Sequence, residues 1–389
     1  MLLLEHDGKD LLARHGAPVP RGTLVLAADE VVGAMLPPGP WMVKAQVGAG
    51  GRGKAGGVRG ARSVAEVGAI VAELSGAMLG RRRIQGFRVE ERLSFLGEAY
   101  VGFFVDPGNA GVRVLLSDKG GVEVETADRA GEVVSGVAEP SLESIAKVVE
   151  DLSSSLPEPV RDAIRAAGLV LASAFVAEEA TLLEVNPVFL MEGGSWVAGD
   201  AKVALDLDTS SRRSTIRDLL DRRPGTYPEA ELKLRHGFDY VTVDPDGEIG
   251  LITTGAGLSM QLIDEMRRSG DRPFNFCDLR SGLLRGDPQR IVDVMRWIAA
   301  GPEVRAVLVN IFAGVTDLGE FARLLVAAAR AVPELKAPMV ARLIGNNFDQ
   351  AREILLESGL AVEVEPDLDA ALAALRAKLA RPRQDTDRC

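Results

Sequence analysis

The sequence has few cysteines and histidines. This scarcity excludes a disulfide framework, a cysteine metal site and a histidine cluster. The 389 residues include only two cysteines and three histidines. Two cysteines cannot build a stapled scaffold or a Cys-based metal site. A basic excess is missing as well: the net charge of −11 argues against nucleic-acid binding. We therefore expect no nucleic-acid partner.

Long apolar runs are also missing. No stretch approaches the roughly 18 uninterrupted apolar residues of a membrane span. The opening segment, Met1 to Asp7, has too short an apolar run and the wrong charge for a signal peptide. We expect a cytoplasmic protein without membrane contact, and its length predicts two or three domains.

Glycine is abundant instead, with 42 residues that gather directly after apolar runs. Phosphate-binding loops occur at such positions. The densest cluster, residues 47–58, contains both G-x-G-x-x-G and G-x-x-x-x-G-K. Both patterns need a helix directly after the loop, whereas residues 55–60 are too rich in glycine to start one. The sequence therefore predicts neither a Rossmann nor a Walker site.

A glycine-rich hairpin between two strands explains the same segment better. Lys44 lies on the strand before it, and Arg52 and Lys54 lie on the loop. Such a loop can fold over a triphosphate and neutralise its charge. A surface hairpin with solvated charges stays open as the alternative.

A second group of polar residues follows an apolar strand. Glu184 and Asn186 end that strand, and Asp200 is expected on the next strand, over residues 196–203. An amide and one or two carboxylates suit Mg²⁺, which completes its shell with phosphates. An asparagine before proline is also a common turn former, so spacing alone leaves both interpretations open.

Strands, glycine-containing loops and helices alternate from residue 249 onward. This pattern predicts parallel βαβ units in a doubly wound sheet, with ligands at the carboxyl ends of the strands. Before it we expect an opening helix over 8–15 and a hairpin of strands 238–243 and 249–253. The predicted domains are 1–240 and 241–381, followed by a disordered tail over 382–389.

Six ordered sequence blocks resemble the β subunit of succinyl-CoA synthetase, an ATP-grasp ligase, and the related malate–CoA ligases. The resemblance runs from about residue 5 to residue 375, and the blocks are 39–44, 50–58, 120–125, 184–187, 255–258 and 309–312. It implies an α/β fold: an ATP-grasp domain followed by a flavodoxin-like domain with a doubly wound parallel sheet.

The resemblance also implies roles for individual residues. The positions that match nucleotide-binding residues are Lys44, Gly51, Arg52, Gly53, Glu90, Leu93 and Glu98. The positions that match Mg²⁺ ligands are Asn186 and Asp200, and those that match the carboxylate site are Thr254, Gly314, Val315 and Thr316. Glu184 matches a glutamate that meets a phosphohistidine, so Glu184 and Arg52 are the expected catalytic residues.

The implied reaction uses ATP, Mg²⁺ and CoA to activate a small carboxylate through an acyl phosphate and a phosphohistidine. None of the three histidines has a glycine-rich loop around it: His6 and His15 lie in or beside the opening helix, and His236 is expected in the interdomain linker. The resemblance therefore implies a separate α subunit that carries the phosphohistidine.

Departures from the family pattern concentrate in the second domain. Arg280-Ser281-Gly282 stands where the family has a glycine run, Thr254 replaces an asparagine, and Asp317-Leu318-Gly319 replaces Arg-Cys-Asp. In the nucleotide half, Gly48 stands where a histidine is frequent. These departures concern the acid more than the nucleotide, so we expect a carboxylate other than plain succinate.

Two other functions stay open at this point. One is an ATP-grasp ligase that joins its acyl phosphate to an amine or another acceptor without CoA. The other is a regulatory paralogue without turnover.

Overall fold

The chain divides into two units, Met1–Tyr227 and Pro228–Cys389, in this computed structural model. The structure describes residues 1–48, 51–80, 82–121, 133–158, 160–237, 239–280, 284–314 and 316–380. The division comes earlier in the chain than the boundary that we expect near residue 240. The expected tail over 382–389 lies outside the described residues.

The first unit opens with helix α1 (Glu5–Arg14), which starts earlier than the predicted residue 8. Acidic Glu5 and Asp7 lie in its first turn, where negative charge interacts favourably with the unpaired N–H groups of a helix start. The earlier start matters because it places Glu5 one turn before Lys9, on the same side of the helix.

A four-stranded antiparallel sheet follows, in the order β1-β6-β2-β3. Its strands are β1 (Gly22–Val25), β2 (Trp41–Ala45), β3 (Val58–Ala61) and β6 (Phe87–Glu91). A short hairpin of β4 (Met78–Leu79) and β5 (Arg82–Arg83) precedes β6. Residues 51–57 connect β2 to β3 through turns, so the predicted hairpin is confirmed and no helix follows the loop directly.

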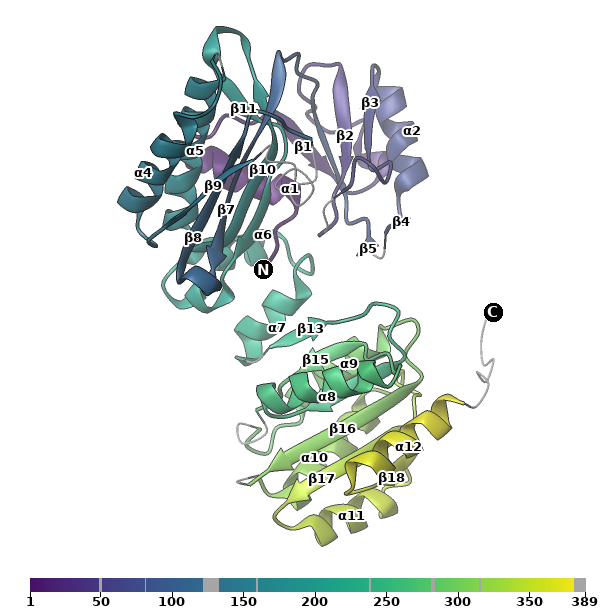
Figure 1. Ribbon diagram of the computed structural model, residues 1–389. Helices are drawn as coiled ribbons and strands as arrows, with labels where there is room; N and C mark the ends of the chain where they lie inside the picture. Colours follow the sequence, from purple (N-terminus) through teal and green to yellow (C-terminus); the bar gives the residue numbers. More distant parts are fainter. Residues whose placement is uncertain are drawn as a thin grey trace. The chain divides into compact units, whose positions relative to one another are not determined.

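Helix α2 (Val64–Leu74) packs on this sheet, next to β2 and β3 (Figure 1). Val67 and Val71, one turn apart, are its buried residues. Ser63 caps the helix by accepting a hydrogen bond from the Glu66 N–H at 3.2 Å.

The second sheet of this unit is built around two long strands. Its members are β7 (Gly97–Asp106), β8 (Gly111–Ser117), β9 (Val134–Ala138), β10 (Ala180–Leu190), β11 (Trp196–Ala198) and β12 (Lys202–Leu205). Helices α4 (Leu142–Ser153) and α5 (Arg161–Ala177) cover one face of the sheet (Figure 1). Helix α6 (Ser214–Arg222) lies near the end of the unit.

Two predictions about this sheet are wrong in detail. Asn186 does not end a strand but lies inside β10, where the register with β7 shifts between Val185 and Val188. The expected single strand over 196–203 is two strands, and Asp200 lies between β11 and β12. Interruptions of a ladder re-aim side chains and are frequent beside active sites, and both polar residues lie at one.

The second unit contains a four-stranded parallel sheet in the order β14-β16-β17-β18. Its strands are β14 (Ile249–Thr253), β16 (Ala306–Ala313), β17 (Met339–Gly345) and β18 (Val362–Val364). Its helices are α8 (Ala256–Arg268), α9 (Gln289–Ala299), α10 (Leu318–Ala331), α11 (Phe348–Glu357) and α12 (Leu368–Leu379). The predicted α/β fold with a doubly wound parallel sheet is confirmed.

The expected hairpin at the start of this unit is wrong. Strand β13 (Tyr240–Thr242) pairs with β15 (Asn275–Cys277) and not with β14. The intervening turn does form, because the Gly247 N–H donates to the Asp244 carbonyl at 2.9 Å. Helix α7 (Pro228–His236) precedes β13, so His236 ends a helix and does not lie in a linker.

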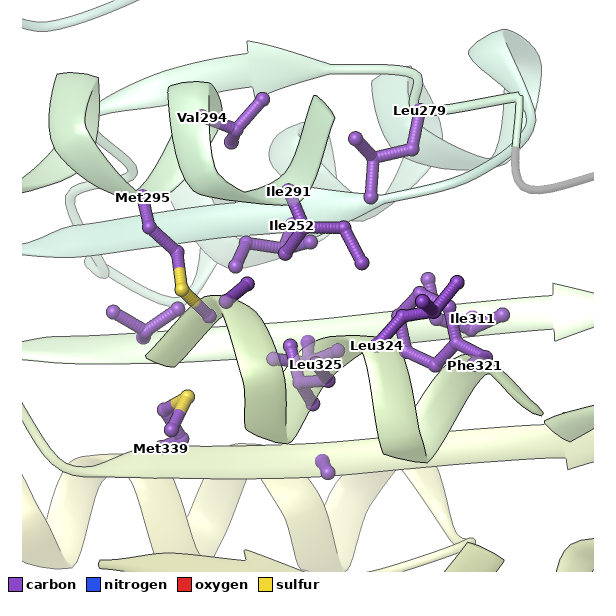
Figure 2. Packing of buried hydrophobic residues seen from close by; sticks show 14 of the residues in the cluster. Ile252, Leu279, Ile291, Val294, Met295, Ile311, Phe321, Leu324, Leu325 and Met339 are labelled. Carbon is purple, nitrogen blue, oxygen red and sulfur yellow. The ribbon is translucent and has the colours of Figure 1, made fainter. Parts of the chain in front are cut away.

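The larger core of the second unit lies between the sheet and the helices of one face. Figure 2 shows Ile252 and Ile311 of the strands against Ile291 and Met295 of α9 and Phe321 of α10. A second cluster packs α8 and α12 on the opposite face. Among the described residues, no helix is long and apolar enough to span a membrane.

Candidate nucleotide and acid sites

A cavity of about 1090 Å³ opens in the first unit, lined by residues of both sheets and of α1. Every residue that the sequence assigns to nucleotide or metal lines it: Lys44, Gly51, Arg52, Gly53, Glu90, Leu93, Glu98, Glu184, Asn186 and Asp200. These residues come from β2, the glycine segment (residues 47–58), β6, the β6–β7 connection, β7, β10 and the β11–β12 connection. The structure thus brings distant parts of the chain to one concave place, the usual form of a small-molecule site.

The glycine segment folds back so that Arg52 enters this cavity. Gly51 has a φ of 74°, a left-handed conformation that favours glycine. The Gly57 N–H donates to the Arg52 carbonyl at 2.9 Å and closes the turn. The Arg52 side chain is only 6% exposed, so its guanidinium lies inside the protein and not on a solvated hairpin.

Arg52 is held by two carboxylates. Its Nη1 donates to Glu5 Oε2 at 2.6 Å, and its Nη2 contacts both carboxylate oxygens of Asp200 at 2.7 Å. Burial alone would lower the pKa of Arg52, but the charges of Glu5 and Asp200 outweigh it and raise that pKa. The guanidinium therefore stays charged and oriented.

Lys44 is the second buried cation of the cavity. Its Nζ lies 3.0 Å from Glu5 Oε1, 2.7 Å from Glu90 Oε1 and 2.7 Å from the Gly199 carbonyl. Burial alone would lower its pKa, but Glu5 and Glu90 overcome that effect and raise it. Two fixed positive groups on one wall suit a phosphate chain.

Two members of this cluster, Glu5 and Lys9, were not predicted from the sequence. Lys9 Nζ lies 2.8 Å from Glu5 Oε1 and 2.7 Å from Glu90 Oε2, and its side chain is fully buried. Burial is the main cause that lowers the pKa of Lys9, and the charge of Glu5 opposes it. The sequence did contain a signal: Glu5 and Lys9 are four residues apart, the spacing of neighbours on a helix, and they lie beside Leu4 and Leu12, which are buried. The signal was missed because the helix was predicted to begin at residue 8.

Asn186 and Asp200 offer oxygen donors to the same cavity. Asn186 Oδ1 accepts a hydrogen bond from the Gly121 N–H at 2.7 Å, and Asp200 pairs with Arg52. Among the described residues, no three His, Cys, Asp or Glu side chains gather as a metal cluster. One amide and one carboxylate are a set of hard ligands that suits Mg²⁺ and would leave most of its shell to water and phosphate.

An apolar wall borders the charged one. The rings of Phe95 and Phe189 stack with their centroids 4.2 Å apart and 11° between their planes, and both line the cavity with Leu93. Stacked aromatic rings beside cations form a place for a planar base next to a place for phosphates.

Glu184 lies on another part of the lining. Its carboxylate is 3.3 Å from Lys202 Nζ, and it faces Gly102 across the β10–β7 ladder. The Tyr100 ring lies over Gly102, where a Cβ would approach its hydroxyl within 2.3 Å. Burial, and next the charge of Glu184, raise the pKa of Tyr100, so its hydroxyl stays protonated near this carboxylate.

The acid-site residues of the second unit lie at the carboxyl ends of its strands. Thr254 follows β14, and Gly314 and Thr316 follow β16. Val315 lies outside the described residues. The Asn346 side chain, after β17, donates to the Gly314 carbonyl at 3.2 Å and ties two strand ends together. Binding sites of doubly wound sheets occur at this edge.

Arg280 is held near this edge by its backbone. Its φ of 47° is left-handed, which non-glycine residues rarely adopt. Asp278 Oδ1 accepts hydrogen bonds from the Arg280 N–H at 3.1 Å and from the Gly255 N–H at 2.9 Å. Partial burial, and next the charge of Arg280, lower the pKa of Arg290.

Asp317 replaces the first residue of the family's Arg-Cys-Asp and has a structural task. It accepts a hydrogen bond from the Glu320 N–H at 2.9 Å and so caps α10, and it accepts another from the Asn347 side chain at 2.7 Å. These contacts hold its pKa below the ordinary value. The substitution therefore preserves an ordered helix start beside Thr316.

Family models match both units. The ATP-grasp domain matches residues 2–190, and the CoA-ligase domain matches residues 252–376. The succinate–CoA ligase [ADP-forming] β subunit of Chloroflexus aggregans is 34% identical over 388 residues, covering 97% of this chain and 100% of that protein. The chain belongs to this family.

Other relatives agree with this assignment. The corresponding β subunit of Paraburkholderia xenovorans is 31% identical, covering 95% of this chain and 97% of its own. A solved ATP citrate lyase from Methanothrix soehngenii, in complex with citrate and coenzyme A, superposes with a TM-score of 0.68 at 19% identity, over 96% and 99% of the two chains. That likeness shows the shared fold. By family the chain is part of an ADP-forming acid–thiol ligase.

Proposed function

We propose that this chain is the nucleotide-binding subunit of an ADP-forming carboxylate–CoA ligase, which acts with an α partner that carries a phosphohistidine. The observation that carries the proposal is the single cavity in which Lys44 and Arg52 lie with Asn186, Asp200 and the stacked Phe95–Phe189 wall. Base, phosphates and a hard cation each have a chemically suited part of that cavity.

The proposed reaction proceeds in three transfers. The terminal phosphoryl group of ATP passes to a ring nitrogen of the partner's histidine, and ADP leaves. A carboxylate oxygen of the acid then takes the phosphoryl group, which gives an acyl phosphate and restores the histidine. The CoA thiolate finally attacks the acyl carbon and expels inorganic phosphate.

In this mechanism Lys44 and Arg52 orient the phosphates and neutralise the charge that spreads over the transferred group. A bound Mg²⁺, held by Asn186 and Asp200, would supply further neutralisation of phosphate charge. Glu184 accepts a hydrogen bond from the incoming histidine ring and orients it. Lys202, whose Nζ lies 3.3 Å from that carboxylate, keeps it in place.

The acid is expected at the second unit, against Thr254 and the loop of Gly314, Val315 and Thr316. The guanidinium group of Arg280 favours an acid with an additional acidic or hydroxyl group over plain succinate, because a guanidinium offers bidentate contacts.

The test is a pull-down for an α partner, followed by assays of the reconstituted pair. A panel of small diacids and hydroxyacids is offered with ATP, Mg²⁺ and either CoA or an amine. CoA-dependent ADP release together with acyl-CoA formation supports the proposal. ADP release that depends on an amine and is indifferent to CoA would contradict it.

A further inference from the structure

Helix α1 reaches the nucleotide cavity through one residue, Glu5. Its side chain is 1% exposed and lines the cavity, although it lies in the first turn of a helix that the sequence places outside the site. A carboxylate at this depth is costly unless it is fully paired. The residues that pair with Glu5 therefore indicate what role its carboxylate has in the cavity.

Glu5 connects the two cations that come from different parts of the chain. Oε1 accepts a hydrogen bond from Lys44 of β2 at 3.0 Å, and Oε2 accepts one from Arg52 of the glycine segment at 2.6 Å. Burial alone would raise the pKa of Glu5, yet the cations, Lys44 foremost, hold that pKa well below its ordinary value. The carboxylate is thus a charged bridge between Lys44 and Arg52.

The two terminal nitrogens of the Arg52 guanidinium group have different partners: Glu5 and the proposed metal ligand, Asp200. Nη1 lies on Glu5, whereas Nη2 lies on both oxygens of Asp200. While both carboxylate oxygens of Asp200 accept hydrogen bonds from Arg52, the lone pairs used in those bonds cannot coordinate a metal ion. When Asp200 turns to a metal, Nη2 becomes available to a phosphate oxygen and Nη1 still has Glu5.

We propose that Glu5 is a positioning residue, which keeps Arg52 beside Lys44 while Asp200 exchanges the arginine for the metal. This inference rests on the proposed function. It predicts that Glu5 couples the metal requirement to nucleotide binding, because without Glu5 the release of Asp200 would leave Arg52 without a protein carboxylate.

A simpler role for Glu5 is to balance the buried charge of Lys9, which lies 2.8 Å from Oε1. The two roles give different results in two variants. Glu5→Asp keeps the charge but shortens the side chain, so its contact with Arg52 is lost. Glu5→Gln combined with Lys9→Met removes one negative and one positive buried charge together.

The experiment measures binding of a non-hydrolysable ATP analogue to the full-length chain by calorimetry, as a function of Mg²⁺ concentration. We expect each variant to raise the half-saturating Mg²⁺ concentration about tenfold, since a charge-assisted hydrogen bond is lost. The thermal midpoint of Glu5→Asp should stay within a few degrees of the wild-type value. Glu73→Gln, which removes a carboxylate from the exposed Arg59 pair on α2, is the matched control.

The outcomes separate the two ideas. A raised Mg²⁺ requirement in both variants supports the positioning role. A wild-type Mg²⁺ requirement in Glu5→Asp, or in the double variant, overturns that role and leaves the proposed function intact. Absence of Mg²⁺-dependent nucleotide binding by the wild-type chain would overturn both.

Discussion

The candidate sites of the two units differ in the kind of residues that form them. The candidate nucleotide site of the first unit consists of buried, mutually paired side chains: Lys44, Arg52 and Glu90 are each less than 10% exposed. The candidate acid site of the second unit lies at loop ends, where Thr254 is buried but Gly314 is exposed and Thr316 is partly exposed. A triphosphate carries several charges and requires preformed cations, whereas a small acid can be held by loops that differ between relatives.

This difference explains where the sequence departs from its family. Glu5, Lys44, Arg52 and Glu90 each have at least two charged partners. Replacing one of them leaves others unpaired, at a cost of roughly 3–5 kcal/mol for a buried pair. In the second unit Asp317 caps a helix at a partly exposed position, and Arg280 is exposed and held by Asp278 through its backbone, so neither side chain belongs to a buried group of ion pairs. Specificity for the acid can therefore change without loss of the nucleotide site.

The largest expected effect comes from Asp200→Asn. An amide keeps the shape but removes the charge offered to Mg²⁺, so turnover of the reconstituted enzyme should fall by at least about a hundredfold. The fold should persist, because Arg52 keeps Glu5. Steady-state rates at saturating Mg²⁺ measure the effect, and Asp218→Asn on the exposed side of α6 is the control. Unchanged turnover would show that Asp200 is not a metal ligand.

A smaller loss is expected from Lys44→Ala. The ammonium that would contact phosphate disappears, while Lys9 still pairs with both Glu5 and Glu90. A charged hydrogen bond contributes about 1.5–3 kcal/mol, so the Kd for ATP should rise about 10- to 100-fold. Calorimetric titration with a non-hydrolysable analogue measures it. If the affinity is unaltered, Lys44 serves only the internal ion pairs.

The sequence predicted the residues that lie in family sequence blocks, but it did not predict features that depend on contacts between distant parts of the chain. The ordered blocks located Lys44, Arg52 and Asn186, and the structure brings them to one cavity. Local pattern could not show that β10 continues through Asn186 with a register shift, since that shift depends on pairing with β7. Propensity likewise placed the start of α1 too late, because buried ion pairs and not apolar spacing fix Glu5 and Lys9.

The pairing of β13 shows the same limit in the second unit. Asp244 and Gly247 do form the predicted turn, but the chain after it enters a different sheet. A Cβ at Gly247 would lie 2.5 Å from the Phe274 Cα, so the turn packs directly against the residue that precedes β15. Which strand becomes the partner is decided by such contacts between residues far apart in sequence.

Arg280→Gly tests the acid site with a smaller change. Glycine adopts a φ of 47° without strain, and this relief offsets the entropy that glycine adds to the unfolded chain, so the variant should be about as stable as the wild type. Loss of one guanidinium should reduce kcat/KM for the preferred acid about tenfold and leave succinate little affected. The measurement is kcat/KM over the acid panel. Equal losses for every acid would contradict a role in selectivity.

The smallest expected effect is a difference in acid sensitivity between the two units. The pKa values of Glu5 and Glu90 are lowered in the folded chain, although burial acts in the opposite direction. A carboxyl whose folded pKa lies below its unfolded value stabilises the protein above the unfolded pKa, about 4.3 for glutamate. That stabilisation is lost as the pH falls from about 4.3 through the folded pKa, because the unfolded state then takes up protons first.

Amide hydrogen exchange between pH 6 and pH 3, corrected for the intrinsic rate, measures this effect in each unit of the intact chain. Protection of α1 and β6 should decrease below about pH 4.3, before that of β16 and β17, whose buried Val307, Val309 and Val340 carry no charge. In the Glu5→Gln, Lys9→Met variant the early decrease in α1 should become smaller, since one of the two buried carboxyls is gone. Equal acid sensitivity of α1 and β16 in the wild type would mean that the buried ion pairs do not set the stability of the nucleotide site.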